Sequence, residues 1–189
     1  MNHYLKTSCI PLILLMFCTS FVVADDKKTK EQDKIKAKTS ETLERLYNIQ
    51  PMSKQAIKDS YGYAVFSNFG MKILLAGGGK GQGVAINNKT GKHTYMKMLE
   101  IQAGLGMGIK KFRVVFVFEN KSVFNEFVNS GWEFGGQSTA AAKLDDTGAS
   151  LSGAISISPG VWMYQLTDDG LALELTMKGT KYMKDDDLN

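Results

Sequence analysis

Apolar residues recur at helical spacing in three parts of the chain. Within the highly charged stretch 25–49 they return about every 3.6 residues, which predicts a helix over 29–48. Pro51 ends this helix, and a short second helix is expected over 53–59 with Ser53 as its cap. A third helix is expected to be capped by Asn120-Lys121-Ser122 and to end at Gly131.

The remainder of the chain shows the short apolar runs and turn signals of β-strands. The turns 87–92 and 167–170 each predict a hairpin. The run 113–119 is almost continuously apolar, so we expect a central strand with both faces covered. We also expect strands over 63–66, 73–86, 93–108, 132–142, 150–158, 161–166 and 171–178, and a solvated tail at 185–187.

This order of elements has no βαβ rhythm, so it predicts the α+β class. The expected architecture is a curved, largely antiparallel, glycine-rich sheet with N-terminal helices and one short helix in mid-chain. Whether the sheet also closes into a partial barrel is left undecided by the sequence.

Glycine occupies every second position in two stretches, where it would leave one face of a strand bare. Glycine weakens a strand, so this pattern calls for bending or for close approach of another group. Two interpretations stay open: packing within the protein, or a groove for an extended ligand such as a lipid chain. The positions are Gly77, Gly79, Gly81 and Gly83 in the first stretch and Gly104, Gly106 and Gly108 in the second.

Residues 1–24 have the pattern of a signal peptide, with Lys6, an apolar run over 10–23 and small residues before a cleavage site after Ala24. A retained anchor is the alternative. We therefore expect a periplasmic or secreted protein with a single domain over 25–189, helical over 25–60 and sheet-rich over 61–189. Cys9 and Cys18 both lie in the segment expected to be removed, so disulfides would play no part.

The formal net charge of +4 is mild and does not point to nucleic acid as a partner. On the first predicted helix Lys27, Lys30, Lys34 and Lys38 share one narrow arc beside an apolar stripe. Lysines in such an arc suit an anionic lipid surface, and a solvated helix face is the alternative. Lys80, in the first glycine stretch, is a candidate contact for a lipid phosphate or a solvated loop lysine.

The residues offer little for catalysis. After removal of 1–24, one histidine, His93, and no cysteine would be left, which excludes a Cys–His nucleophile and a cysteine-based zinc site. The segment around Lys80 lacks the P-loop spacing, because Gly81 follows the lysine. We expect no catalytic residue, metal or cofactor, and a hydrolase with a site that the sequence does not reveal is the less favoured hypothesis.

Four motifs follow one another along the chain: Tyr61-Gly62-Tyr63-Ala64-Val65-Phe66, Gly77-Gly78-Gly79-Lys80-Gly81-Gln82-Gly83-Val84, Gln102-Ala103-Gly104-Leu105-Gly106 and Trp132-Glu133-Phe134-Gly135. In this order they resemble the SYLF domain, and the resemblance covers about 29–189. It implies binding of acidic phospholipids and phosphoinositides through a basic N-terminal helix, which here matches the lysines of 27–38. Eukaryotic members also bind actin, whereas the secreted bacterial branch meets no actin in its compartment.

The sequence thus predicts a non-enzymatic lipid-binding domain that docks on anionic, phosphoinositide-like surfaces through its basic first helix. The alternative is a structural or protein-interaction domain whose glycine-lined sheet receives a protein partner.

Overall fold

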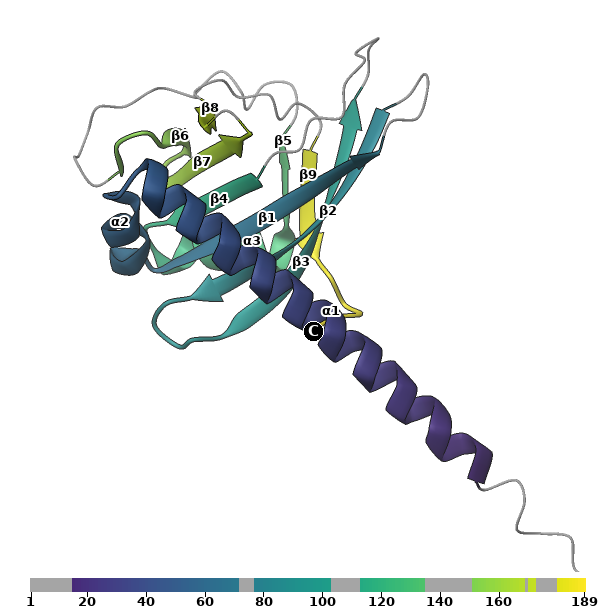
Figure 1. Cartoon of the computed structure of the whole chain (residues 1–189). Helices are drawn as coiled ribbons and strands as arrows, with labels where there is room; N and C mark the ends of the chain where they lie inside the picture. Colours follow the sequence, from purple (N-terminus) through teal and green to yellow (C-terminus); the bar gives the residue numbers. More distant parts are fainter. Residues whose placement is uncertain (1–14, 72–76, 103–112, 135–150, 169, 173–179) are drawn as a thin grey trace, which may run out of the picture.

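The computed structural model of the chain describes residues 15–71, 77–102, 113–134, 151–168, 170–172 and 180–189 (Figure 1). These residues form three helices and nine strands, and they confirm the predicted α+β class with a curved antiparallel sheet. The elements are α1 (Leu15–Ile49), α2 (Ser53–Asp59), β1 (Gly62–Met71), β2 (Gly77–Asn87), β3 (His93–Gln102), β4 (Arg113–Phe118), α3 (Lys121–Ser130), β5 (Trp132–Phe134), β6 (Ile155–Ser158), β7 (Val161–Thr167), β8 (Gly170–Ala172) and β9 (Thr180–Lys184).

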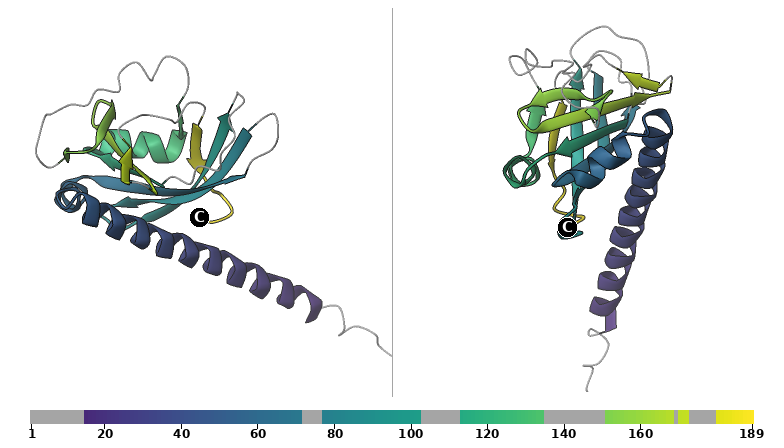
Figure 2. Two further views of the ribbon diagram at one scale, coloured as in Figure 1. Left: turned by 45° about the horizontal axis from the view of Figure 1, so that its top comes forward. Right: turned by 90° about the vertical axis from the view of Figure 1, so that its left-hand side faces the viewer.

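The described strands make one sheet in the order β5-β9-β3-β2-β1-β4-β7-β6, with β8 paired to β7 beside this path. All of these pairs are antiparallel. The sheet curves around α3 on its concave side, while α1 runs along its convex side and extends beyond it (Figure 2). Both faces of the sheet are therefore covered by a helix.

Strand β4 is central, as its apolar run predicted, because it lies between β1 and β7 and its residues 114–118 are all buried. Successive side chains point to opposite faces of a sheet. Phe116 consequently joins the aromatic cluster on the concave side with Phe66 and Phe127, whereas Val115 faces Leu46 of α1 on the convex side. The apolar run of β4 is continuous because each face of the sheet packs against its own hydrophobic core.

The predicted hairpin between β2 and β3 is present, and its turn is built by Asn87. The Asn87 carboxamide oxygen accepts hydrogen bonds from the backbone N–H groups of Lys89 (2.8 Å) and Thr90 (3.1 Å). Gly91 takes φ +69°, a conformation that favours glycine. This turn sets a register in which Gln82 faces Lys97.

Helix α3 also follows its sequence signals. The Asn120 side chain accepts from the N–H groups of Ser122 and Val123, and Gly131 ends the helix at φ 73°. Helix α2 has the predicted bounds, but the cap prediction was wrong: Met52 is the N-cap, and the Ser53 hydroxyl donates to the Gln50 carbonyl oxygen instead (2.6 Å).

Helix α1 begins at Leu15, well before the expected start near residue 29, so the predicted cleavage site after Ala24 lies within a continuous helix of the full chain. Among the described residues, no helix combines the length and the apolar character needed to cross a membrane.

Other differences concern the ends of the sheet. Strand β1 extends to Met71, and β9, which was not predicted, pairs with β3. The tail was expected to be solvated, but Asp185 is buried because it packs beside β3, while Asp186 and Asp187 are exposed. Predicted strand segments at 73–76, 103–108, 135–142, 150 and 173–178 lie largely or wholly outside the described residues.

Candidate functional site

A groove of about 490 Å³ lies between α1 and the convex face of the sheet. Four lysines, a serine and a glutamine line it, together with apolar side chains and one carboxylate. Helix α1 forms one wall, strands β1 to β3 form the floor, and the segment after β9 closes one side. The lining residues are Lys34, Ile35, Lys38, Ser67, Lys80, Gly81, Gln82, Lys97, Met98, Leu99 and Asp185.

The groove exists because apolar residues hold α1 against the sheet at two points. Leu46 is fully buried in a cluster with Val65 and Tyr164, and Ile35 is buried with Val84 and Tyr95. Burying a side chain of this size contributes about 1.5–3 kcal/mol. Beyond Val84 the same row of β2 continues with Gln82 and Lys80, so the apolar contact ends and a polar hollow begins.

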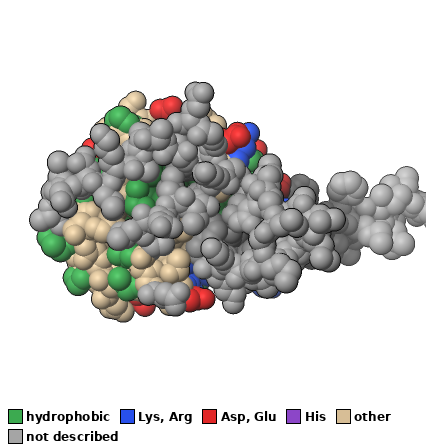
Figure 3. Space-filling model, turned by 90° about the horizontal axis from the view of Figure 1, so that it is seen from above, with side chains coloured by type: hydrophobic (Ala, Val, Ile, Leu, Met, Phe, Trp, Pro, Cys, Tyr) green, Lys and Arg blue, Asp and Glu red, His purple; other side chains and the backbone are tan. Residues whose placement is uncertain are grey.

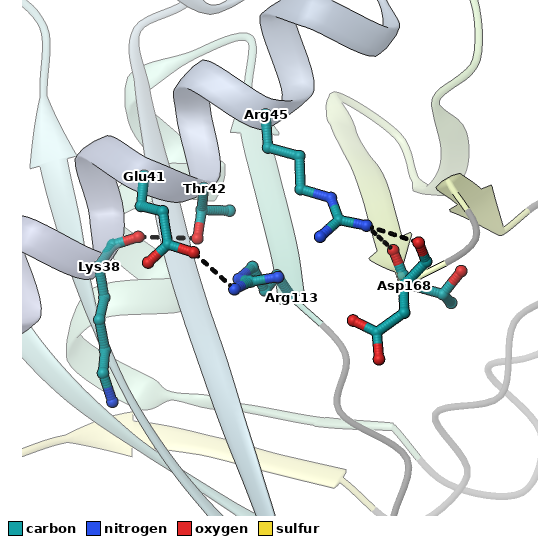
Figure 4. A network of polar contacts seen from close by, with 7 residues as sticks. Lys38, Glu41, Thr42, Arg45, Arg113 and Asp168 are labelled. Atoms are coloured by element: carbon teal, nitrogen blue, oxygen red, sulfur yellow. Dashed lines mark hydrogen bonds and ion pairs between the residues drawn. The ribbon is translucent and has the colours of Figure 1, made fainter.

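Polar contacts fix the same helix near its C-terminal end (Figure 4). The Arg45 guanidinium donates to the carbonyl oxygens of Thr167 (2.6 Å) and Asp168 (2.9 Å). Glu41 forms an ion pair with Arg113 at the start of β4 (2.7 Å). These contacts prevent α1 from rotating about its axis, and so they determine which of its lysines face the groove.

Residues after β9 fasten the middle of α1 to β3. The Asn189 carboxamide donates to the Tyr95 carbonyl oxygen (2.8 Å) and accepts from the Tyr95 N–H (2.9 Å), as a neighbouring strand would. Gln32 of α1 donates to the Leu188 carbonyl oxygen (2.8 Å). This arrangement places Asp185 at the edge of the groove, where its carboxylate accepts from the Asp187 N–H (3.3 Å).

The electrostatics of the groove are strongly positive. Burial, followed by the neighbouring ammonium of Lys34, lowers the pKa of Lys38. Lys34 forms a long ion pair with Glu31 (3.7 Å), and both groups are exposed enough for the pair to contribute little. The lining itself carries four ammonium groups and one carboxylate, that of Asp185, and Glu31 lies beside Lys34 outside the lining.

The structure brings together three of the five lysines predicted to bind lipid, namely Lys34, Lys38 and Lys80. Lys27 and Lys30 lie further out on α1, where Lys27 is exposed and Lys30 pairs with Asp26 (2.6 Å). They extend the positive arc away from the groove.

Lys97 is the groove lysine that sequence reasoning missed. A signal for it was available, because the turn at 87–92 sets the pairing of the hairpin that it closes. Counting back from that turn places Lys97 opposite Gln82, on the same face as Lys80.

The glycines of the first stretch lie in β2, and Gly83 shows one reason for the pattern. A Cβ atom at this position would overlap the Val65 carbonyl oxygen and the ring of Phe66. At Gly83 the bare face is therefore filled by the protein's own core, which supports the packing interpretation there. Gly81 is buried as well, Gly77 and Gly79 belong to the same strand, and Gly104, Gly106 and Gly108 lie outside the described residues.

A second hollow of about 500 Å³ lies near the end of α1 and is lined by Glu41, Glu44 and Asp168 around Arg45. The Arg45 guanidinium is already bonded to carbonyl oxygens, so the acidic groups dominate this hollow and disfavour an anionic ligand. Seen from above, the described part of the surface shows hydrophobic side chains in small groups rather than one broad patch (Figure 3).

Two side chains among the described residues, those of His93 and Glu119, belong to types that acid–base catalysis can use. His93 is exposed at the start of β3. Glu119 accepts a hydrogen bond from the indole N–H of Trp162 (2.7 Å), which holds the end of β4 to β7. Trp162 is itself buried in the cluster that contains Leu46 and Tyr164.

The protein is thus a curved antiparallel sheet with helix α1 on the convex side of the sheet. The face of α1 that borders the groove is rich in lysine. No known family model matches the chain. The chain is similar to Beta cell expansion factor A of Aeromonas veronii, with 37% identity over 163 residues. The match covers 85% of this chain and 60% of the relative, so the chain spans less than two thirds of that protein's length.

Proposed function

We propose that this protein is a non-enzymatic lipid-binding domain that docks on anionic phospholipid surfaces, including phosphoinositide-like ones, outside the cytoplasm. One observation carries the proposal: lysines from α1, β2 and β3 line the same groove, although they lie far apart in the sequence. The resemblance to the SYLF domain supports the same function.

The docking face consists of Lys27, Lys30, Lys34 and Lys38 along α1, continued by Lys80 and Lys97 on the sheet. A lysine near an anionic membrane contributes about 1 kcal/mol, so several together suffice for reversible docking. The lysine stems provide apolar surface under these charges. Neither a covalent anchor nor a spanning helix is needed for such an interaction.

Co-sedimentation with vesicles tests this function. We expect the protein to pellet with vesicles that contain phosphatidylglycerol and to stay in solution with pure phosphatidylcholine. Raising the salt from about 0.1 M to about 1 M shortens the screening length from roughly 10 Å to roughly 3 Å and should release the protein.

A triple variant, Lys34→Glu, Lys38→Glu and Lys80→Glu, should lose most of the binding while it keeps its circular dichroism spectrum and unfolding midpoint. Equal pelleting with neutral and anionic vesicles, unchanged in this variant, would contradict the proposed function.

A further inference from the structure

The lysines of the groove surround a concave site rather than a flat charged surface. Ser67, Gln82 and Lys97 follow one another across β1, β2 and β3 in a single row of the register. Lys34 and Lys38 of α1 stand beside this row. A ligand in the groove would therefore meet charged groups from the helix on one side and from the sheet on the other.

The charge of the lining calls for an anion with more than one negative charge. Four ammonium groups share the groove with the carboxylate of Asp185, which is 8% exposed and already accepts a backbone N–H. The loss of water on burial, followed by the close approach of Lys34, also lowers the pKa of Lys38. A phosphomonoester carries about −1.5 to −2 at pH 7, more than a carboxylate or a phosphodiester.

The size of the groove limits how much of a lipid it can hold. Its volume of about 490 Å³ lies within the range of small-molecule sites. At roughly 30 Å³ for each water-sized group, it accommodates about sixteen such groups. A phosphorylated headgroup fits within this volume, whereas two long acyl chains exceed it.

We propose that the groove binds one phosphomonoester headgroup of a membrane lipid, held between the lysines of α1 and those of β2 and β3. This inference rests on the proposed function and adds a single defined site to it. The Ser67 hydroxyl and the Gln82 carboxamide are the uncharged hydrogen-bonding groups of the lining. The acyl chains stay in the membrane, and α1 remains packed on the sheet during binding, because both walls of the groove contribute ligands.

The test compares two anionic lipids at equal surface charge. Phosphatidate presents a phosphomonoester and phosphatidylglycerol a phosphodiester, each mixed into phosphatidylcholine vesicles at fractions matched for zeta potential. Full-length protein should bind the phosphatidate vesicles about fivefold more tightly, as expected when one additional charge meets a lysine. Equal affinities would overturn the inference and leave the proposed function standing, while failure to bind either vesicle would refute both.

Matched variants locate the site. The double variant Lys80→Gln, Lys97→Gln should abolish the preference for phosphatidate. The double variant Lys27→Gln, Lys30→Gln removes the same charge outside the groove and should weaken binding to both lipids equally. Unfolding midpoints confirm that each variant is folded. If the preference survives in the first pair, the groove is not the site.

A soluble competitor separates a membrane lipid from a free phosphorylated molecule. Glycerol 3-phosphate carries the same phosphomonoester without acyl chains. Weak competition at millimolar concentration supports the inference. Tight binding of glycerol 3-phosphate with no preference for phosphatidate vesicles would overturn it in favour of a soluble ligand.

Discussion

Gly83 is the residue at which the unusual glycine pattern has a definite structural reason. Any side chain there would enter the space of the Phe66 ring and of the Val65 carbonyl oxygen. We expect Gly83→Ala to destabilise the domain by about 1–3 kcal/mol, the range for overpacked cores, as measured by urea unfolding.

The comparison is Gly91→Ala, at a turn position with φ +69° and nothing within 4 Å. This change acts only through backbone conformation and should cost about 1 kcal/mol. A Gly83→Ala protein that is at least as stable as Gly91→Ala would contradict the packing interpretation.

Tyr164 carries a buried hydroxyl group that destabilises the domain. Its side chain is fully buried, and its hydroxyl makes no hydrogen bond in the structure as described. An unpaired buried polar group costs about 1–3 kcal/mol. Tyr164→Phe should therefore raise the free energy of unfolding by about 1 kcal/mol, and a clear loss of stability would show that the hydroxyl has a partner.

The free energy of unfolding at alkaline pH tests the same residue in a second way. Burial raises the pKa of Tyr164 to about 12, whereas an unfolded tyrosine ionises near 10. The unfolded chain thus releases its proton first, so this contribution to stability is complete below pH 10 and is lost as the pH rises to about 12. Burial also raises the pKa values of Tyr47 and Tyr63. Tyr164→Phe should make the decline shallower without removing it, and an unchanged slope would contradict this assignment.

At the scale of elements, α1 depends on the sheet for its position. Leu46 is fully buried beneath it, while Ile49, one turn later, is 41% exposed. Leu46→Ala should cost about 2–5 kcal/mol and speed hydrogen exchange along α1, whereas Ile49→Ala should change stability by less than about 0.5 kcal/mol. Similar effects of the two changes would mean that α1 is not anchored at Leu46.

Elements with complete local signals were predictable from the sequence. The Asn120 cap and Gly131 delimit α3, and the apolar run of β4 indicates its central place. The pairing of β9 with β3 was not predictable, because it joins residues about 85 positions apart and no local pattern encodes it. The buried position of Asp185 depends on that same pairing.

At the scale of the whole molecule, the groove joins residues that local patterns describe separately. Helical periodicity placed Lys34 and Lys38 on one arc, and Lys80 was a candidate because it follows three glycines. Lys97 and Asp185 enter only through the sheet register and the path of the chain after β9. The sequence therefore indicated the charge of the site but not its concave shape.

The proposed function requires that the side of the molecule carrying α1 meets the membrane. Ala37 is exposed on α1 next to Lys38, and Asn129 is exposed on α3, on the opposite side of the sheet. Each can be changed to cysteine in a chain with Cys9→Ser and Cys18→Ser and labelled with an environment-sensitive fluorophore.

The most direct measurement is the emission of these two labels on addition of anionic vesicles. We predict a blue shift and protection from a water-soluble quencher at position 37, reversed by high salt, with no change at position 129. A shift at position 129 alone, or binding that leaves position 37 exposed to the quencher, would contradict the claim that the lysine groove faces the lipid.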